Sequence, residues 1–405
     1  MNLLMKKALI IGYGISGKAA EKLLIHCGYQ VVVADDKQVP NSAIDWEQIT
    51  LAILSPGVPQ SHPACQEALA RKIPLTGEAA FALSASKQPC VAITGTNGKT
   101  TVTEMACHLL KGMGRKARML GNIGDPLSLY FINPDLAEIL VIELSSYQLE
   151  TFEQTPIFES GVILNITPDH LDRYGTIEPY ARAKFRLQKA IKERGILYIH
   201  PEVVAEFGSL IRGNFALLPL ELSEKLAPIF SFPHDRENAL AAYSLCKPFG
   251  LCFDLFLKLI ATFKKEDHRI ELTRTISGIT FYNDSKGTNI DAVIKAVSGM
   301  PGKVLLIAGG VDKGGGYALW KKNFSGKVSH LFTLGEAAPL IEKEMGGDFP
   351  CTRMQTLEEA VKCAYKSAGP GDVVLLSPGC ASFDMFKDYK ERGELFKRYV
   401  NEIQE

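Results

Sequence analysis

The segment VAITGTNGKTTVT, Val91–Thr103, joins an apolar run to a glycine-rich loop and then to a helical pattern. Val91–Ile93 predicts a buried strand, the loop is Gly95–Thr100, and apolar residues then recur at helical spacing. Glycines let backbone N–H groups turn toward an anion, and a helix N-terminus adds partial positive charge. The segment therefore predicts a phosphate site and, with it, a nucleoside triphosphate ligand.

Two side chains at the end of this loop have expected roles. Lys99 should reach the β- and γ-phosphates, and the Thr100 hydroxyl should bind Mg²⁺. The loop reads GxxGKT, two residues shorter than the usual GxxxxGK[ST], so the motif alone also fits an ordinary strand-to-helix turn. A Lys-Thr pair placed between a strand and a helix favours the phosphate site.

The composition indicates a soluble protein of two or three domains. The chain has 405 residues, and its 45 basic and 45 acidic side chains balance, so no basic excess favours nucleic acid or an anionic membrane surface. Nine cysteines without a CxxC pair indicate reduced thiols. The apolar run Ala8–Ile11 is too short for a signal-peptide core, and no run is long enough to span a membrane. We expect a cytoplasmic monomer.

The first 60 residues present three loops at the carboxyl ends of predicted strands. ALIIGYGISG, residues 8–17, runs into a GxGxxG turn, and the strand Val31–Ala34 is followed by Asp35 about 20 residues on. The strand Leu51–Leu54 ends at Ser55. The literal interpretation is a dinucleotide site, but the same geometry suits any diphosphate or a purely structural turn. The polar segment Ser84–Pro89 suggests a domain boundary.

The segment after the phosphate loop adds three candidate side chains. A strand over Ile139–Leu144 places Glu143 where a nucleotide site needs a second Mg²⁺ ligand. His170 follows another strand, although a lone histidine near acidic residues is most often a surface-loop residue. The amphipathic pattern of Glu178–Lys192 predicts a helix that carries Lys184, which by itself is most simply a solvated lysine.

The last third of the chain predicts another sheet. Three apolar strands each lead into loops with lysines and hydroxyls: Thr280–Tyr282, Val304–Ala308 and Val373–Leu376. Strand–turn–helix alternation predicts a parallel sheet here too. The expected fold class is α/β, with three domains at residues 1–88, 89–266 and 267–405.

The motifs, taken in order, resemble the Mur ligase family over nearly the whole chain. They are TGTNGKTT (94–101), ELSSYQLE (143–150), NITPDHLDRY (165–174), YARAK (180–184), DHR (267–269), NDSKGTN (283–289) and GGVDKG (309–314). GYGISG (12–17) and SPGCASFDMFKDYKERGELF (377–396) are similar to the family members that add D-glutamate to UDP-N-acetylmuramoyl-L-alanine. No one of these motifs is sufficient, but their combination is highly specific.

The resemblance implies a Rossmann-like nucleotide-sugar domain, a central P-loop ATPase-like domain and a C-terminal Rossmann-like domain. It also implies an ATP-dependent ligase that forms a peptide bond through an acyl phosphate and releases ADP and phosphate. The reaction belongs to peptidoglycan precursor synthesis, with small-molecule substrates and neither nucleic acid nor membrane as partner. Two Mg²⁺ ions and ATP are the implied cofactor and co-substrate.

The family's functional residues carry over to this sequence by motif. The implied catalytic residues are Lys99, Glu143, His170 and Lys184. The metal ligands are Thr100, Glu143, His170 and a carbamylated Lys184. The ATP contacts are Gly95, Thr96, Asn97, Gly98, Lys99, Thr100, Thr101, Asn238, Arg269 and Asp284. The UDP-substrate contacts are Gly14, Ile15, Ser16, Asp35, Asp36, Lys37, Ser55, Gly57 and Asn122. The D-glutamate contacts are Thr288, Lys313, Ser382, Phe383 and Tyr389.

Three alternatives remain open at the level of sequence. The first is another Mur ligase, adding L-alanine or the third residue, which the SPGCASFD tail and the early GxGxxG disfavour. The second is a dinucleotide-dependent oxidoreductase, against which the central ATP loop argues. The third is a non-catalytic nucleotide-binding module, which would not need Glu143, His170 and Lys184 together.

Overall fold

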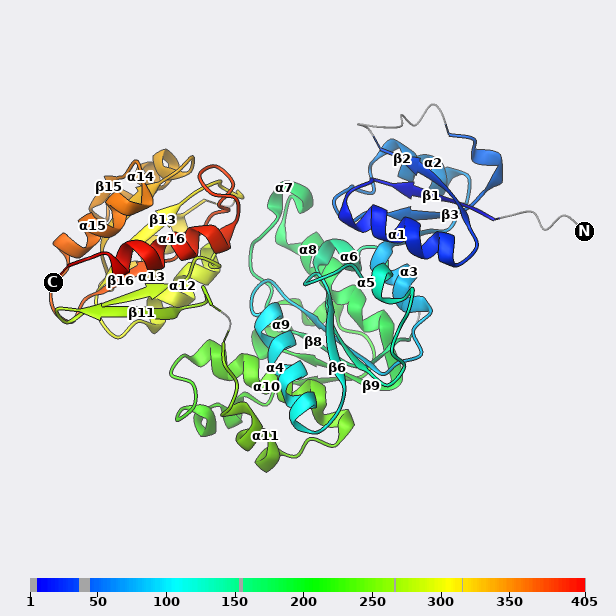
Figure 1. Cartoon of the computed structure of the whole chain (residues 1–405), viewed down its shortest axis with the longest axis horizontal. Coiled ribbons are helices and arrows are strands. Elements are labelled where there is room, and N and C mark those ends of the chain that lie inside the picture. The colour runs from blue at the N-terminus through cyan, green and yellow to red at the C-terminus, as the bar shows by residue number, and fades with distance from the viewer. Residues whose placement is uncertain (1–5, 36–43, 153–155, 266, 315, 405) are drawn as a thin grey trace, which may run out of the picture. The chain divides into compact units, whose positions relative to one another are not determined.

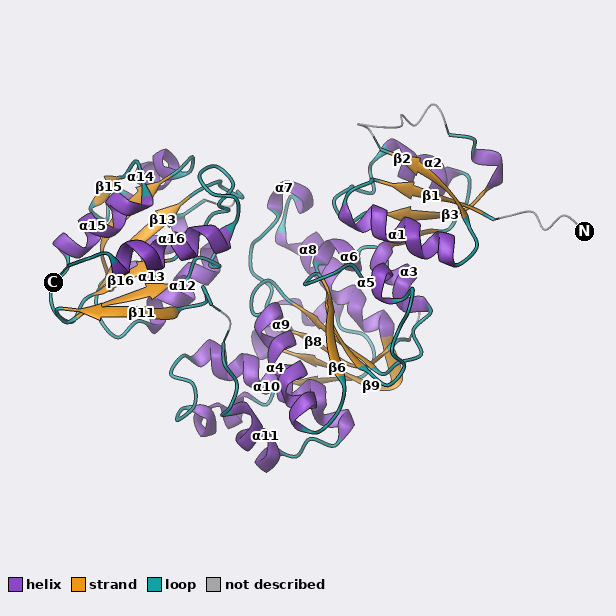
Figure 2. Cartoon of the chain, viewed as in Figure 1, coloured by secondary structure: helices purple, strands orange, loops and turns teal. Residues whose placement is uncertain are grey.

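The computed structural model describes residues 6–35, 44–152, 156–265, 267–314 and 316–404, which form three sheets flanked by helices (Figures 1 and 2). The first sheet is parallel, in the order β2-β1-β3-β4. Its strands are β1 (Lys7–Ile11), β2 (Gln30–Ala34), β3 (Ile49–Leu54) and β4 (Leu75–Gly77), and its helices are α1 (Ile15–His26), α2 (Pro63–Ala70) and α3 (Glu78–Ser84).

The second sheet is also parallel, in the order β10-β9-β8-β5-β7-β6. Its strands are β5 (Cys90–Thr94), β6 (Ala117–Gly121), β7 (Ile139–Glu143), β8 (Phe158–Ile163), β9 (Ile191–Ile199) and β10 (Phe215–Leu217). The helices of this region are α4 (Lys99–Gly112), α5 (Leu127–Tyr130), α6 (Ser146–Leu149), α7 (Leu171–Tyr174), α8 (Ile177–Phe185), α9 (Pro201–Phe207), α10 (Pro233–Cys246) and α11 (Phe253–Ile260).

Strand β5 lies inside this sheet, between β8 and β7, and is fully buried. Its residues Val91 and Ile93 pack in one apolar cluster with Val102 and Met105 of α4. Burying a side chain of this size contributes about 1.5–3 kcal/mol. The cluster therefore fixes the strand and helix on either side of the glycine loop, and parallel pairing brings the carboxyl ends of β5, β7 and β8 to one edge.

The third sheet has the order β11-β12-β16-β13-β14-β15. Its strands are β11 (Glu271–Ile276), β12 (Ile279–Asn283), β13 (Val304–Gly309), β14 (Val328–Leu334), β15 (Cys351–Arg353) and β16 (Val373–Leu376). Its helices are α12 (Ile290–Gly299), α13 (Ala318–Phe324), α14 (Ala338–Met345), α15 (Leu357–Ser367) and α16 (Tyr389–Asn401). Alternate strand residues enter two separate cores, Leu306 and Leu375 in one and Ile307 and Leu376 in the other, so helices cover both faces.

Two predicted elements differ in the structure. The third sheet is not wholly parallel, because β11 and β12 pair antiparallel. They are joined by the two-residue turn Ser277–Gly278, whose φ angles are 49° and 80°, and positive φ at both positions suits a tight hairpin. The helix predicted over 178–192 ends at Phe185. Ile191 pairs instead with Phe158 of β8, so sheet pairing overrides the helical pattern.

The chain divides into two compact units. The first contains residues 1–166, 178–231 and 235–263, and the second contains 167–177, 232–234 and 264–405. The three predicted domain ranges stay a prediction, with the boundary at residue 266 outside the described residues. In the part of the chain that the structure describes, no helix is both long and apolar enough to cross a membrane.

Candidate functional site

The glycine loop after β5 is held by one asparagine. The backbone N–H groups of Thr96 and Asn97 donate to the carbonyl and side-chain oxygens of Asn165, each at 2.8 Å. The Asn165 amide returns a bond to the Asn97 carbonyl at 3.0 Å. Asn165 follows β8, so two neighbouring strand ends lock the loop. It belongs to the motif NITPDHLDRY, but nothing in the sequence assigns it this role.

Two lysines converge on the loop. The Lys99 ammonium donates to the carbonyls of Gly95 and Thr96 at 2.9 and 2.8 Å. The Lys184 ammonium donates to the same Gly95 carbonyl at 2.8 Å and lies 4.3 Å from the centre of the Tyr180 ring. Lys184 is 1% exposed, so its interpretation as a solvated lysine is wrong. Two ammonium groups on one neutral oxygen repel each other, which favours either an anion at this point or loss of charge from one of the two lysines.

Glu143 offers an oxygen suited to a cation. It ends β7 and is 2% exposed, and its Oε1 accepts from the Asn122 amide at 3.0 Å. Its Oε2 is buried and has no hydrogen-bond partner among the described residues. An unpartnered buried carboxylate oxygen is costly unless a cation or water satisfies it. Asn122 orients this carboxylate in the structure, and its contact with the UDP substrate stays a prediction.

The donors present fit Mg²⁺ better than a metal with a dedicated protein cage. The described residues contain no group of three or more His, Cys, Asp or Glu side chains that could hold a metal. Mg²⁺ usually takes one or two protein oxygens and completes its shell with water and substrate phosphates. Glu143 and the Thr100 hydroxyl, in the first turn of α4, are ligands of this kind.

Asn238 packs against the glycine loop at Gly98. It lies on α10, and its side-chain oxygen occupies the space beside Gly98, where an added Cβ would lie only 2.5 Å away. Gly98 also has a φ of 86°, a conformation that residues with a Cβ avoid. The structure thus brings Asn238, predicted to contact ATP, to the phosphate loop.

Gly98→Ala should therefore destabilise the protein and weaken nucleotide binding. The left-handed conformation alone costs a residue with a Cβ about 1–2 kcal/mol. Gly114→Ala is a matched control, because Gly114 has a φ of 75° but nothing within 4 Å of an added Cβ. Urea unfolding should show a larger loss for Gly98→Ala than for Gly114→Ala. Equal losses would mean that contact with Asn238 is unimportant.

His170 lies on a strained backbone in a different compact unit. Its φ and ψ are 55° and 33°, it precedes α7, and its Nε2 lies 3.7 Å from the Asp169 carboxylate. The segment 167–177 belongs to the second unit. Its predicted place beside a second Mg²⁺ stays a prediction. Left-handed backbone at a residue other than glycine marks a position worth testing for function.

The GxGxxG turn of the first sheet is tightly built. A Cβ at Gly17 would lie 2.2 Å from the Gly12 carbonyl, and the Ser55 hydroxyl donates to that carbonyl at 2.6 Å. The Asp35 carboxylate accepts from the Tyr13 N–H at 2.8 Å. The following residues, from Gly14 to Ser16, begin α1, and Ile15 is 80% exposed. Asp36 and Lys37 lie outside the described residues. Gly57, in the loop that follows β3, is exposed.

In the second unit, Asp284 is a buried carboxyl at the end of β12. Its oxygens accept from the Ser377 hydroxyl at 2.7 Å and from the Ile270 N–H at 3.3 Å. Burial raises the pKa of Asp284 to about 6, although the Ser377 bond and the charges of Lys265 and Arg269 act in the opposite direction. The predicted ATP contacts Arg269 and Asp284 are thus electrostatically coupled.

Asp284 should make stability fall as pH rises through the range between 3.8 and about 6. The folded protein keeps this proton to higher pH than the unfolded chain does, so its stabilising contribution is complete below the unfolded pKa. That contribution is lost as pH rises through the folded pKa, with a slope of at most about 1.4 kcal/mol per pH unit. Urea unfolding from pH 4 to 7 should show a falling difference between wild type and Asp284→Asn. A stability difference that stays constant from pH 4 to 7 would contradict the raised pKa of Asp284.

The predicted amino-acid contacts come together in part. The Lys313 ammonium donates to the Thr288 hydroxyl at 3.2 Å. Val311 and Ala381 exchange backbone hydrogen bonds of 2.9 and 3.0 Å, which joins the loop of Lys313 to the loop of Ser382. Phe383 is 75% exposed, and the Tyr389 ring lies 5.2 Å from the Lys286 ammonium. A lysine and hydroxyls grouped in this way suit a carboxylate ligand.

Arg392 is a site residue that the sequence did not single out. It is 1% exposed on α16, and its guanidinium donates to the Ser285 carbonyl at 2.9 Å and to its hydroxyl at 3.0 Å. Weaker contacts at 3.4 and 3.5 Å reach the Cys380 carbonyl. Burial lowers the pKa of Arg392 to about 10. Arg392 thus ties together the loops after β12 and β16. The sequence shows only an arginine within an amphipathic helical pattern, and its burial is a property of the folded structure.

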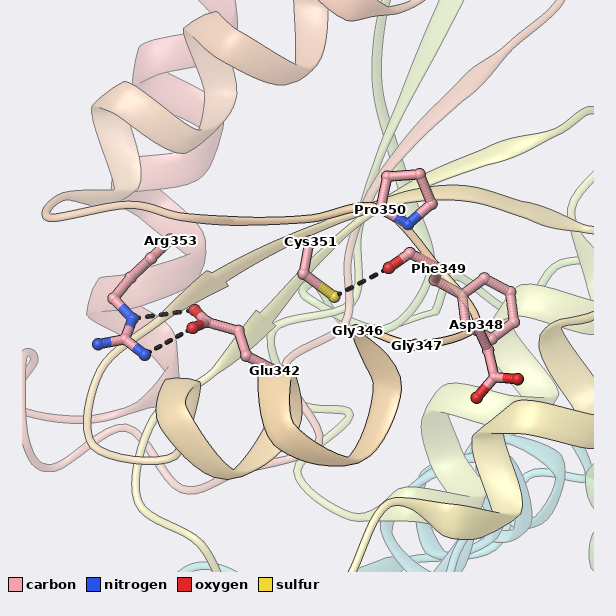
Figure 3. Close-up of a pocket in the computed structure, with 8 residues that line it drawn as sticks. All are labelled: Glu342, Gly346, Gly347, Asp348, Phe349, Pro350, Cys351 and Arg353. Carbon is pink, nitrogen blue, oxygen red and sulfur yellow. Dashed lines mark hydrogen bonds and ion pairs between the residues drawn. The ribbon is translucent and has the colours of Figure 1, made fainter.

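A cavity of about 520 Å³ lies elsewhere in the second unit, beside α14 and β15 (Figure 3). Its main charges pair with each other, since Arg353 contacts Glu342 at 2.9 and 2.5 Å. The Cys351 thiol faces the Phe349 carbonyl at 3.4 Å, and burial raises the pKa of Cys351. None of the predicted site residues lines this cavity, and its paired charges and protonated thiol provide no convergent chemistry.

Comparisons with known proteins show which family the chain resembles. Residues 93–207 match the Mur ligase middle domain, and residues 268–380 match the glutamate ligase domain of Mur ligases. The chain is 42% identical over 434 residues to UDP-N-acetylmuramoylalanine–D-glutamate ligase of Protochlamydia amoebophila, covering 98% of both chains. It is 38% identical to the enzyme of that name from Thermoanaerobacter pseudethanolicus, covering 100% of both.

A solved structure with the same fold is the MurF ligase of Thermotoga maritima in complex with ADP. Its TM-score is 0.61 at 16% identity, with 99% of each chain covered. The UDP-N-acetylmuramate–alanine ligase of that organism gives a TM-score of 0.56 at 17% identity, covering 98% of this chain and all of the other. These likenesses confirm the predicted α/β fold class.

Proposed function

This chain belongs to the Mur ligase family, and we propose that it joins D-glutamate to UDP-N-acetylmuramoyl-L-alanine at the expense of ATP. The products are the extended UDP-sugar peptide, ADP and phosphate, and the reaction supplies precursors for peptidoglycan. The observation that carries the proposal is 42% identity over almost the whole of a relative named for this reaction. The enzyme acts in the cytoplasm as a monomer.

The first half of the reaction must activate a carboxylate. The substrate's terminal carboxylate is a poor electrophile, so ATP converts it to an acyl phosphate and ADP leaves. The attacking carboxylate and the γ-phosphate are both negative, and a cation between them lowers the barrier. We assign this role to Lys99, and the support is that its ammonium lies on the Gly95 and Thr96 carbonyls of the glycine loop.

Mg²⁺ is the metal that the donor set supports. Thr100 and Glu143 would hold it, and the buried, unpartnered Glu143 Oε2 is the supporting observation. When bound, Mg²⁺ neutralises charge on the phosphates and makes the phosphorus a better electrophile. We assign His170 to a second ion on the motif alone.

Lys184 acts as a carbamate in this proposal. An ammonium beside a divalent cation is repelled, whereas a carbamate supplies the anionic oxygen that Mg²⁺ prefers. The support is its burial together with its position on the carbonyl that also receives Lys99. Addition of CO₂ to the neutral amine forms the N–C bond, and the proton leaves to solvent.

The second half of the reaction forms the peptide bond. The amine of D-glutamate attacks the acyl phosphate carbonyl, and the tetrahedral intermediate expels phosphate. Lys313 and Thr288, joined at 3.2 Å, hold a carboxylate of the incoming amino acid, together with Ser382, Phe383 and Tyr389. On their motifs alone, we assign Asn238, Arg269 and Asp284 to the nucleotide and the edge of the first sheet to the UDP group.

An amino-acid panel tests the function. Purified protein with ATP, Mg²⁺ and UDP-N-acetylmuramoyl-L-alanine should release phosphate with D-glutamate but not with L-glutamate, L-alanine or meso-diaminopimelate. Turnover with L-alanine and the shorter UDP-sugar acid, or with meso-diaminopimelate and the longer UDP-sugar peptide, would identify a different ligase. NAD(P)H fluorescence titration should show no binding, and saturable binding would revive the oxidoreductase alternative.

A further inference from the structure

The loop that carries Lys313 is held in place by a hydrogen bond from a buried tyrosine. Tyr317 is fully buried, and its hydroxyl contacts the Asp312 carboxylate at 2.9 Å and the Cys380 sulfur at 3.1 Å. The second oxygen of Asp312 accepts from the Gly314 N–H at 3.0 Å. Asp312 and Gly314 flank Lys313 in the sequence, so one carboxylate fixes the backbone on both sides of that lysine.

The direction of these hydrogen bonds follows from the chemistry of the groups. Burial raises the pKa of Cys380 to about 11 and also raises the pKa of Tyr317, so both keep their protons at neutral pH. The Tyr317 hydroxyl donates to the carboxylate of Asp312, which can only accept when ionised. The Cys380 thiol then donates to the Tyr317 oxygen. The chain of bonds runs from Cys380, beside Ala381 and Ser382, to the residue before Lys313.

The tyrosine ring has little freedom to move. It packs against Trp320 with the ring centroids 4.9 Å apart, and the Trp320 indole donates to the Ile290 carbonyl at 3.2 Å. Trp320 also packs so closely on Gly379 that a Cβ there would lie 2.8 Å from the indole. The hydroxyl of Tyr317 is therefore held at a fixed point between the two loops.

We propose that Tyr317 is a positioning residue for the amino-acid substrate, acting through Asp312 and Cys380 to hold Lys313 and Ser382 in their binding geometry. Lys313 has a flexible stem and bonds Thr288 at 3.2 Å, so its affinity for a carboxylate depends on how well its backbone is ordered beforehand. This inference rests on the proposed function, and it assigns to Tyr317 an effect on amino-acid binding that is separate from ATP binding.

The test is a steady-state comparison of wild type with Tyr317→Phe, which keeps the ring in its packing against Trp320. The KM for D-glutamate should rise about tenfold, which is on the order of the contribution of one hydrogen bond to a charged group. The kcat and the KM for ATP should each change less than twofold. Tyr365→Phe is the matched control, because Tyr365 lies on α15 of the same unit and packs against Phe281.

A double-mutant cycle separates positioning from general loosening. Asp312→Ala removes an exposed side chain, and the effect of Tyr317→Phe on the D-glutamate KM should largely vanish in that background. Full additivity, an unchanged KM in Tyr317→Phe, or equal changes in the D-glutamate and ATP constants would each overturn the proposal. Should Tyr317→Phe not fold, Asp312→Ala alone must raise the D-glutamate KM selectively. Absence of D-glutamate-dependent turnover in wild type would instead reject the proposed function.

Discussion

Lys99→Ala should abolish most ligation while leaving the fold intact. Lys99 is only partly buried, and it donates to two carbonyls of its own loop, so little packing is lost. Its charge is needed when the γ-phosphate is attacked, and a preorganised charge of this kind contributes about 10²-fold or more in rate. We expect a thermal midpoint near that of wild type and a fall of at least about 10² in phosphate release.

Lys111→Ala is the matched control for that variant. Lys111 is an exposed lysine in the last turn of the same helix, α4, so its removal changes net charge and helix composition equally. Its activity should stay near that of wild type. Wild-type turnover in Lys99→Ala would reject the assignment of residues 94–101 as the ATP loop.

Lys184→Ala should be nearly inactive and partly rescued by small carboxylates. If the working group is a carbamate, acetate or formate can enter the space left by the side chain and supply an anionic oxygen. Chloride at equal ionic strength offers no such oxygen and should not rescue. Activity of the variant should be measured as phosphate release with increasing acetate. The wild-type enzyme should lose activity in CO₂-depleted buffer and regain it when bicarbonate is added.

Arg182→Ala controls for loss of a cation on the same helix. Arg182 lies on α8 two residues before Lys184, is exposed and pairs with Glu178 at 2.8 Å. It should remain active and insensitive to acetate. Wild-type turnover in Lys184→Ala would show that this lysine only packs beneath the loop. Inactivity without rescue by acetate or formate would argue against the carbamate, leaving a purely structural role.

The sequence predicted the parts of the fold that depend on local patterns. Strand, glycine loop and helix around Lys99 appear as expected, because apolar periodicity and glycine placement are local signals. The hairpin of β11 and β12 was missed because the antiparallel pairing depends on the turn Ser277–Gly278, which reads as an ordinary loop. The end of α8 at Phe185 was missed because pairing of Ile191 with β8 is a tertiary effect.

The site was predictable only where a motif identified the residue type. Glu143 and Asn238 were expected near ATP, but the sequence could not show that Asn122 would orient Glu143 or that Asn165 would lock the loop. Lys184 looked like a solvated lysine, because burial is a property of the packed structure and not of helical periodicity. The bracing contacts of Tyr317 were invisible for the same reason.

The central claim is that ligation proceeds through an acyl phosphate and then transfers the acyl group to D-glutamate. We would prepare UDP-N-acetylmuramoyl-L-alanine with ¹⁸O in its terminal carboxylate and measure the mass of the phosphate released. One labelled oxygen should pass to phosphate in each turnover, and the UDP-sugar peptide should form with D-glutamate but not with L-glutamate. Unlabelled phosphate accompanied by product would contradict the acyl-phosphate route, and labelled phosphate without a D-glutamyl product would contradict the assigned substrate.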